Sequence, residues 1–321
     1  GPRGALEGFG HIGSYETAQV KIQPDGTAII STGAAPHGQG TVTTLAQIAA
    51  DNLQMDIDKI TVRYGDTDTV PQGVGTMGSR ITAIAGQATQ QASIKVADQA
   101  KRIAAHKLEA DVDDIELADG NFFVAGTPSV SVSWAEVGWA GLSPTELPED
   151  MQAGCLDELV FAEATGFTFP NGAYICVVGV DRDTGAVEIE QFHLVDDCGT
   201  VINPLLAEGQ VEGGVAQGIA QALFEEMVYS DEGQLLTSTL LDYLAPSACD
   251  VPEMTSLGRT TTVTPHNTLG AKGIGESGAI GSPPAVINAV VDALSGFGVK
   301  HVDMPATPQK VWNLMNNGQE G

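Results

Sequence analysis

The sequence predicts an α+β fold built from two similar subdomains, each a hairpin or small sheet packed with helices. A β-hairpin, a segment containing glycine and glutamine, and an apolar-faced helix follow one another in the first half, and the same order returns in the second half. The chain has 321 residues, of which 42% are hydrophobic, so it can bury a substantial core. We expect a first subdomain over residues 1–145 and a second over 146–321, with cofactor-binding loops at their helix N-termini.

The first half is expected to contain a hairpin, a helix, a strand and a long helix. Apolar residues on either side of an Asp-Gly turn predict the hairpin over residues 20–32. Thr41 is expected to cap the following helix, whose apolar positions recur at helical spacing. A strand is predicted near 60–62, and a long helix from Ala83 to about Leu108.

The second half repeats this order. Strands are predicted over 174–179 and 187–195, on either side of an Asp-Thr-Gly turn. The segment 209–214, Gly-Gln-Val-Glu-Gly-Gly, is expected to open a helix, because apolar residues follow it at helical spacing. The proline-containing stretch 140–158 is typical of a connector between the two halves.

The composition excludes several classes of partner. A net charge of −27 argues against nucleic acid, because phosphate contacts need a basic surface. No apolar run approaches the roughly 20 residues that span a bilayer, and the first residues lack an apolar signal core, so we expect a cytoplasmic protein. The sequence leaves open whether the acidity is a salt adaptation or a solvated surface. The cysteines form no Cys-x-x-Cys pair and are expected to be reduced, buried thiols: Cys155, Cys176, Cys198 and Cys249.

The few basic residues of this acidic chain include two in glycine-rich segments, Arg80 and Lys272. A scarce cation beside flexible backbone suggests a bound anion. The histidines are scattered without a metal-ligand spacing, and a polar strand end explains Asp196-Asp197 better than a metal site. We therefore expect no direct protein ligand to a metal.

Glu276 is the most informative single residue, since it stands among glycines just before a predicted helix. The spacing Gly-x-Gly-x-x-Gly around it also matches a dinucleotide-binding loop. That loop needs a continuous strand before it, and Pro265 interrupts the lead-in. A serine-hydrolase elbow fails as well, because Ala279 stands where glycine is required. A carboxylate positioned by glycines remains a candidate general base.

Four glycine-rich loops are then available to bind a cofactor: 38–40, 78–80, 209–214 and 270–276. Glutamine amides and backbone groups can pair with a heterocycle that carries both donors and acceptors. Ser79, Arg80 and a helix N-terminus can hold a phosphate. Four such loops together favour a cofactor over plain turns.

These loops occur in an order that resembles a known family. The matching motifs are Gly38-Gln39-Gly40-Thr41-x-Thr43, Thr76-x-Gly78-Ser79-Arg80, Asp197-x-Gly199-x-x-Ile202-Asn203-Pro204, Gly209-Gln210-Val211-x-Gly213-Gly214 and Gly270-Ala271-Lys272-Gly273-x-Gly275-Glu276. Nearly the whole chain is similar to the C-terminal half of the molybdenum-binding subunit of the molybdenum hydroxylases. That family includes xanthine dehydrogenase, aldehyde oxidoreductase, aerobic carbon monoxide dehydrogenase and nicotinate dehydrogenase.

The resemblance implies a cofactor and roles for the loops. The cofactor would be molybdopterin, in the mononucleotide or the cytosine dinucleotide form, with molybdenum held through the pterin dithiolene. Gln39 and Gln210 would contact the pterin or lie near the oxo ligands of the metal, and Glu276 would be the catalytic base. The remaining positions would hold the phosphate region or flank the pterin: Gly38, Gly40, Gly78, Ser79, Arg80, Lys272, Gly273 and Gly275.

The resemblance also implies partners, because it extends to only half of that subunit. The chain is then either a natural split subunit or one piece of a cut or truncated chain. We expect the N-terminal half of the molybdenum subunit as a separate chain, an iron–sulfur subunit with 2Fe-2S clusters, and a subunit with FAD. The implied reaction oxidises an aldehyde or an N-heterocycle with water as oxygen donor. Two alternatives remain: a non-catalytic assembly or binding subunit with the same fold, and a subunit like that of carbon monoxide dehydrogenase.

Overall fold

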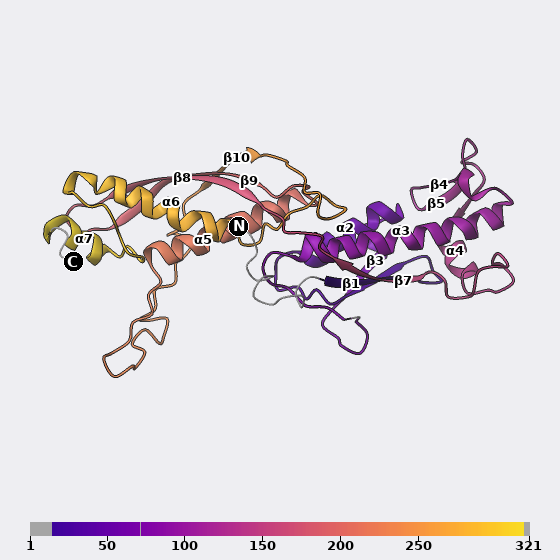
Figure 1. Ribbon diagram of the computed structural model, residues 1–321, viewed down its shortest axis with the longest axis horizontal. Helices are drawn as coiled ribbons and strands as arrows, with labels where there is room; N and C mark the ends of the chain where they lie inside the picture. Colours follow the sequence, from indigo (N-terminus) through magenta and orange to yellow (C-terminus); the bar gives the residue numbers. More distant parts are fainter. Residues whose placement is uncertain (1–14, 71, 318–321) are drawn as a thin grey trace.

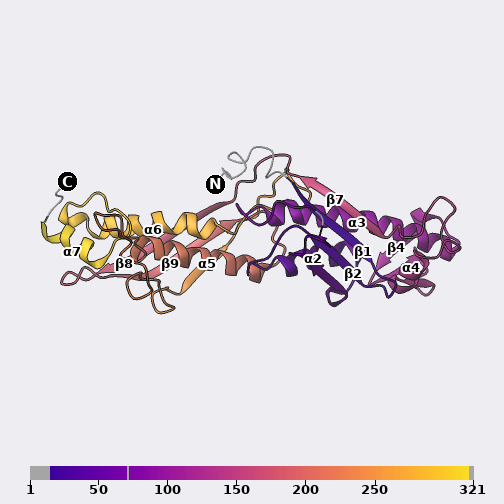
Figure 2. The same ribbon diagram turned by 90° about the horizontal axis from the view of Figure 1, so that it is seen from below.

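The computed structural model describes residues 15–70 and 72–317 as two lobes that lie end to end in an elongated molecule (Figures 1 and 2). Each lobe has a sheet with helices on one of its faces, so the predicted α+β class is confirmed. Within the described residues, no helix combines the length and the apolar character needed to cross a membrane.

The first lobe begins with an antiparallel hairpin of β1 (Tyr15–Ile22) and β2 (Ala28–Thr32). After α2 (Thr41–Leu53) and a 3₁₀ turn over Ile57–Lys59, β3 (Ile60–Arg63) pairs parallel to β2. The long helix α3 (Ile81–Leu108) then packs against α2 and β1. The predicted hairpin, strand and long helix are confirmed, with α3 beginning two residues before its expected start.

Two features of this lobe are absent from the sequence prediction. A small antiparallel sheet of β4 (Ile115–Ala118), β5 (Asn121–Val124) and β6 (Ser131–Ser133), with a 3₁₀ turn over Val112–Asp114, lies against α3 and is followed by α4 (Trp134–Ala140). The strand β7 (Asp157–Glu163) returns to pair with β1. The chain therefore leaves the first sheet only after Glu163, beyond the boundary expected at 145–146.

The second lobe starts with the antiparallel strands β8 (Asn171–Val180) and β9 (Val187–Asp197). They are followed by α5 (Pro204–Leu223), β10 (Met254–Arg259) and α6 (Ser277–Ala293). A 3₁₀ turn over Ser295–Phe297 and α7 (Pro308–Asn317) complete the described chain. Helices α5 and α6 pack together, and α6 packs on β8.

The expected repeat is confirmed and is longer than the sequence indicates. In both lobes a hairpin is followed by a helix, then by a strand parallel to the hairpin's second strand, then by a second helix. The strand orders β3-β2-β1 and β10-β9-β8 correspond element by element. The helices that follow the two hairpins approach each other where the lobes meet (Figure 1).

The start of α5 corrects one expectation. Residues 209–214 lie inside this helix, whereas the sequence pattern predicts that they open it. The helix begins at Pro204, because Asn203 accepts a hydrogen bond from the backbone of Leu206 and proline suits the first helical position. These glycines instead let α5 pack closely against α6, since a Cβ on Gly214 would lie 3.0 Å from the backbone of Gly278 in α6.

Each lobe has its own apolar core, and a third, smaller cluster joins them. The first core lies between β1, β2 and α3, and the second lies between β9, α5 and α6. The small cluster combines Ala34, which follows β2, and residues of α2 and α3 with two residues from the second half of the chain: Ala34, Leu45, Ile48, Ile81 and Ala85, with Ile202 and Leu269 packed against them. This junction fixes the loops of one lobe against those of the other.

Candidate functional site

A cavity of about 280 Å³ lies at the junction, between the N-terminal ends of α2, α3 and α6 and the side of α5. It gathers eight of the positions that the sequence singles out: Gln39, Gly78, Ser79, Arg80, Gln210, Gly273, Gly275 and Glu276. Gly38, Gly40 and Lys272 do not line it. Two lobes therefore contribute to one site, as the repeat predicts.

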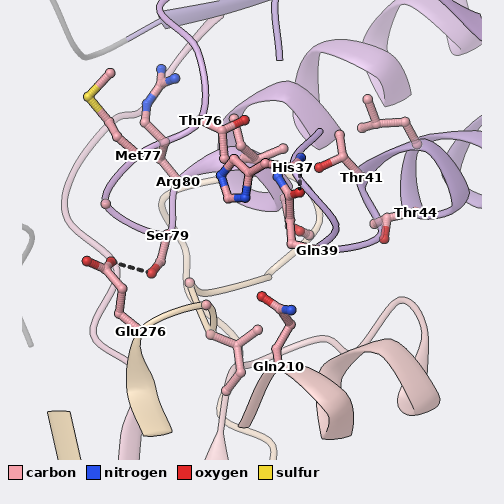
Figure 3. A pocket seen from close by; sticks show the side chains of 17 residues that line it. His37, Gln39, Thr41, Thr44, Thr76, Met77, Ser79, Arg80, Gln210 and Glu276 are labelled. Carbon is pink, nitrogen blue, oxygen red and sulfur yellow. Dashed lines mark hydrogen bonds between the residues drawn. The ribbon is translucent and has the colours of Figure 1, made fainter. Parts of the chain in front are cut away.

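Glu276 is joined to the first lobe by a hydrogen bond. The Ser79 hydroxyl donates to Glu276 Oε2 at 2.5 Å, as drawn in Figure 3. Ser79 has a φ of 56°, a left-handed conformation that is uncommon for a residue with a side chain. A Cβ on Gly273 would lie 2.3 Å from the Ser79 carbonyl oxygen, so only glycine lets the two loops meet this closely. The backbone is thus strained where it presents Ser79 to the carboxylate.

Two glutamines reach the same cavity from different elements. The Gln39 carbonyl accepts a hydrogen bond from the His37 backbone at 2.7 Å, whereas its Nε2 is buried with no partner. Gln210 extends from α5 toward the loop that carries Gln39 (Figure 3). A buried amide donor without a partner is costly, so it indicates a ligand acceptor in the cavity.

Thr41 corrects a second expectation. It is the first residue of α2, and the cap position is taken by Gly40 with a φ of 82°. The Thr41 hydroxyl therefore caps nothing, and it is buried without a partner in the wall of the cavity. A Cβ on Gly40 would lie 2.7 Å from the Leu206 side chain, so glycine is required here for both its conformation and its contact.

Three helices begin at this cavity, and none has a side-chain cap hydrogen bond. These are α2, α3 and α6, whose cap residues are Gly40, Arg80 and Glu276. The N–H groups of a first helical turn have no partner within the helix, and they carry a partial positive charge. Their convergence favours a ligand with negative charge, such as a phosphate.

Arg80 does not supply that positive charge. Its guanidinium forms a buried ion pair with Glu16 and also donates to the carbonyl oxygens of Gly75 and Tyr15. Glu16 in turn accepts from the backbone of Val74 and Gly75. A fully buried carboxylate of the same chain therefore already compensates the charge of this side chain, which the sequence does not indicate. Its contacts fix the loop that carries Ser79.

Lys272 has a similar role on the other side of the site. It is buried, and its Nζ lies 3.2 Å from Asp197 Oδ1, so this cation too is paired within the chain. Burial alone would raise the pKa of Asp197, but hydrogen bonds from Gly199, Thr262 and Lys272 outweigh it and lower the pKa to about 2. Asp197 at the end of β9 therefore anchors the loop that leads to Glu276.

Sequence reasoning misses several residues of the wall: His37, Thr44, Met77 and Thr82. His37 and Met77 stand directly beside a predicted loop, which is the one signal that could have found them. Thr44 lies one turn inside α2, where its hydroxyl bonds to the Gly40 carbonyl oxygen at 3.0 Å. No group of three or more His, Cys, Asp or Glu side chains that could hold a metal occurs among residues 15–70 and 72–317.

Two observations indicate that the residues lining the cavity suit a cofactor such as molybdopterin. The unpartnered amide of Gln39 and hydroxyl of Thr41 suit a ring system with hydrogen-bonding edges. The three uncapped helix N-termini suit its phosphate. Both kinds of group face the same cavity.

Comparison with known proteins agrees with this geometry. The chain is 40% identical over 304 residues to the carbon monoxide dehydrogenase large chain of Hydrogenophaga pseudoflava, covering 95% of this chain and 37% of that one. It is 39% identical to the nicotine 6-hydroxylase large subunit of Paenarthrobacter nicotinovorans, covering 92% of this chain and 36% of that subunit. The solved structure of quinoline 2-oxidoreductase from Pseudomonas putida 86 superposes with a TM-score of 0.87 at 38% identity, covering 94% of this chain and 38% of that chain.

The chain thus spans a little over a third of the length of these relatives. The family model described as a molybdopterin cofactor-binding domain matches residues 4–252, well over half of the chain. The resemblance in the sequence motifs is therefore confirmed, and the chain belongs to the molybdopterin cofactor-binding family found in the large subunits of molybdenum hydroxylases.

Proposed function

We propose that this chain is the cofactor-binding part of a molybdenum hydroxylase that oxidises an aldehyde or an N-heterocycle with water as oxygen donor. The observation that carries the proposal is the Ser79–Glu276 hydrogen bond beside the two glutamine amides, in one cavity between the lobes. The names of relatives that act on nicotine and quinoline support an N-heterocyclic substrate.

Gln39 and Gln210 would bind the pterin through their amides. The Thr41 hydroxyl would also bind the ring system, and the backbone at the starts of α2 and α3 would hold the phosphate, with Gly78 and Ser79 contributing backbone N–H groups. Gly273 and Gly275 would let the chain pass close to the pterin plane. The bound cofactor supplies two-electron oxidation of a carbon and transfer of oxygen derived from water. Arg80 and Lys272 would act indirectly, by fixing the loops.

Glu276 would act as the general base that accepts the proton released when the substrate is hydroxylated. Ser79 donates to Oε2, so it orients the carboxylate. Glu276 stands at the N-terminal cap of α6 and lines the cavity that both lobes share.

The cavity needs a further protein part to close it. Glu276 and Met77 are both exposed, so the wall is open to solvent beside the proposed base. We propose that the remainder of the large subunit covers this side, and that 2Fe-2S and FAD subunits carry the electrons away.

We also propose the cytosine dinucleotide form of the cofactor, and a cytoplasmic location. No disulfide joins the four cysteines; Cys198 is buried as expected, whereas Cys155 and Cys176 are half-buried and Cys249 is exposed.

Metal and pterin analysis of the natively purified complex tests the proposal. We expect about one molybdenum and one pterin per chain, with cytidine monophosphate released on hydrolysis. A complete complex without molybdenum would instead support the alternative of a non-catalytic assembly subunit. Turnover of carbon monoxide, with none of aldehydes or N-heterocycles, would favour the carbon monoxide dehydrogenase-like alternative.

Glu276→Gln separates the base from the binding site. The amide keeps the shape and the contact with Ser79 but cannot accept the proton. We expect turnover to fall by at least ~100-fold, while molybdenum and pterin contents stay at the wild-type level. A variant that turns over at the normal rate would show that Glu276 is not the base.

A further inference from the structure

Residues 225–253, between α5 and β10, form a segment that we call the arm. It leaves the end of α5 and projects away from both lobes (Figure 1). Large apolar side chains along it stand in solvent: Met227, Val228, Tyr229, Leu236, Leu240, Leu241 and Leu244. The two at its tip are the most exposed of the chain's described large hydrophobic residues, Leu240 at 84% and Leu241 at 96%.

The tip is held in shape by local hydrogen bonds. The backbone of Asp242 and Tyr243 donates to the Thr239 carbonyl oxygen at 3.1 and 2.8 Å, and the Thr239 hydroxyl donates to the Asp242 carboxylate at 2.9 Å. This turn places Leu240 and Leu241 at its outer side. Nearer to α5, the backbone of Leu236 donates to the Val228 carbonyl oxygen at 2.8 Å. The arm is therefore preorganised, which lowers the entropy cost of binding.

Isolated apolar side chains are common on protein surfaces, but seven on one projecting segment mark an interaction site. We propose that the arm inserts Leu240 and Leu241 into an apolar socket on the part of the molybdenum hydroxylase large subunit that this chain does not contain. The proposal rests on the function proposed above, since it takes the large subunit as the assembly.

The extent of the match to relatives supports this occupant. The alignment covers 95% of this chain but 37% of the carbon monoxide dehydrogenase large chain, so the larger part of such a subunit lies outside the matched region. The family model also extends to residue 252, through almost the whole arm. The arm thus belongs to a domain that occurs together with a much larger remainder.

Charge argues against a second copy of this chain as the occupant. Residues 225–253 contain seven acidic residues and no lysine, arginine or histidine. The whole chain has a net charge of −27, so the acidic arm would meet a predominantly acidic surface on a second copy. The socket is expected to be apolar and to carry lysine or arginine at its rim, which would steer the acidic arm toward it.

Photo-crosslinking in the native complex tests the occupant. A photoreactive phenylalanine replaces Leu241 in the tagged chain, the complex is irradiated before purification, and the linked peptides are sequenced. We expect peptides of the remainder of the large subunit, whether it is a separate chain or continuous with this one. Links to a second copy of the arm-bearing chain, to an iron–sulfur or flavin subunit, or to no protein would each overturn the proposal.

The double variant Leu240→Ser/Leu241→Ser tests the contribution of the tip. We expect the fraction of the variant chain that is recovered in the complex to fall at least ~10-fold, because leucines buried at an interface contribute strongly to the binding free energy. Val130→Ser, at a 55% exposed position on the first lobe, is the control and should assemble normally. Because both sites are exposed, the thermal unfolding of each variant should match the wild type, and normal assembly of the double variant would overturn the proposal.

Molybdenum content of the wild-type complex keeps this inference separate from the proposed function. A link from Leu241 to the large subunit in a complex without molybdenum supports the arm and contradicts the enzymatic function. A complex that contains molybdenum but in which Leu241 forms no link supports the enzymatic function and contradicts the proposed role of the arm.

Discussion

The Ser79 side chain combines backbone strain with a short contact to the proposed base. Its left-handed backbone would suit glycine better, yet the hydroxyl that reaches Glu276 requires a side chain. Strain of this kind is stored where the surrounding structure holds a residue for a function. Here Gly273 and the loop fixed by Arg80 supply that surrounding structure.

Two substitutions at Ser79 separate strain from function. Ser79→Ala and Ser79→Gly both remove the hydroxyl, so each should lower turnover by about 10-fold as the carboxylate loses its orientation. The glycine variant should be more stable than the alanine variant by about 1 kcal/mol, because it adopts the left-handed conformation without strain. Steady-state kinetics and denaturant unfolding measure the two effects. Full activity in both variants would contradict the orienting role.

Asp197 gives the chain a defined dependence of stability on pH. Its pKa falls from 3.8 to about 2 on folding, so its stabilising effect is complete above pH 4 and is lost as the pH falls from about 4 to 2. A shift of this size corresponds to about 2 kcal/mol. Asp197→Asn should lose about that free energy of unfolding at pH 7 and should show a weaker decline below pH 4. Urea unfolding at a series of pH values measures it, and an unchanged acid decline would contradict the assignment.

Glycines have two different uses within the single helix α5. A Cβ on Gly218 would lie 1.9 Å from the Ser282 hydroxyl and 2.8 Å from the Pro283 ring in α6, whereas a Cβ on Gly213 would meet nothing within 4 Å. Ser282 is buried and hydrogen-bonded to the Gly278 carbonyl oxygen at 2.7 Å, so it resists displacement. The contact between α5 and α6 therefore depends on Gly218.

The two glycines form a matched pair for measurement. Gly218→Ala should destabilise the chain by about 2 kcal/mol through overpacking. Gly213→Ala should stabilise it by up to about 1 kcal/mol, because alanine is the better helix former. Thermal unfolding of both variants is the test. A loss of stability in Gly213→Ala equal to that in Gly218→Ala would show that helix propensity and packing do not explain the difference.

The same glycines show why the sequence predicts elements better than it predicts their ends. Apolar periodicity and turn residues are local, so the hairpins, β3 and α3 are predicted from them. Gly209 to Gly214 resembles a loop because glycine disfavours helices, and only the close approach of α6 explains its helical setting. The sequence does not reveal β7 for a related reason, because its pairing with β1 joins segments that are far apart in the chain.

The site itself was predicted in part. The family resemblance identified Gln39, Gln210 and Glu276, and the fold brings all three to one cavity. It did not reveal that Arg80 and Lys272 are neutralised within the chain, because their partners Glu16 and Asp197 lie far away in the sequence. Buried cations require such partners, but no local pattern indicates which carboxylate supplies them.

At the scale of the whole molecule, the cavity exists only while the two lobes stay in register. Leu269 packs into the small junction cluster, and a Cβ on Gly86 of α3 would lie 2.8 Å from it. The adjacent Thr268 backbone donates to the Gln87 side chain at 3.1 Å. The segment that leads to Glu276 is thus attached to the first lobe just before it enters the site.

Loosening this junction should affect cofactor binding more than the stability of either core. Leu269→Ala removes apolar contact between the lobes, so the loop of Glu276 loses its register with Ser79. We expect the variant complex to lose most of its molybdenum on prolonged dialysis, with little change in its thermal unfolding. Val290→Ala is the control, because Val290 is fully buried in the second core. It should lower the free energy of unfolding by about 2 kcal/mol and retain the metal. If both variants kept or lost molybdenum alike, global stability and not lobe register would control the site.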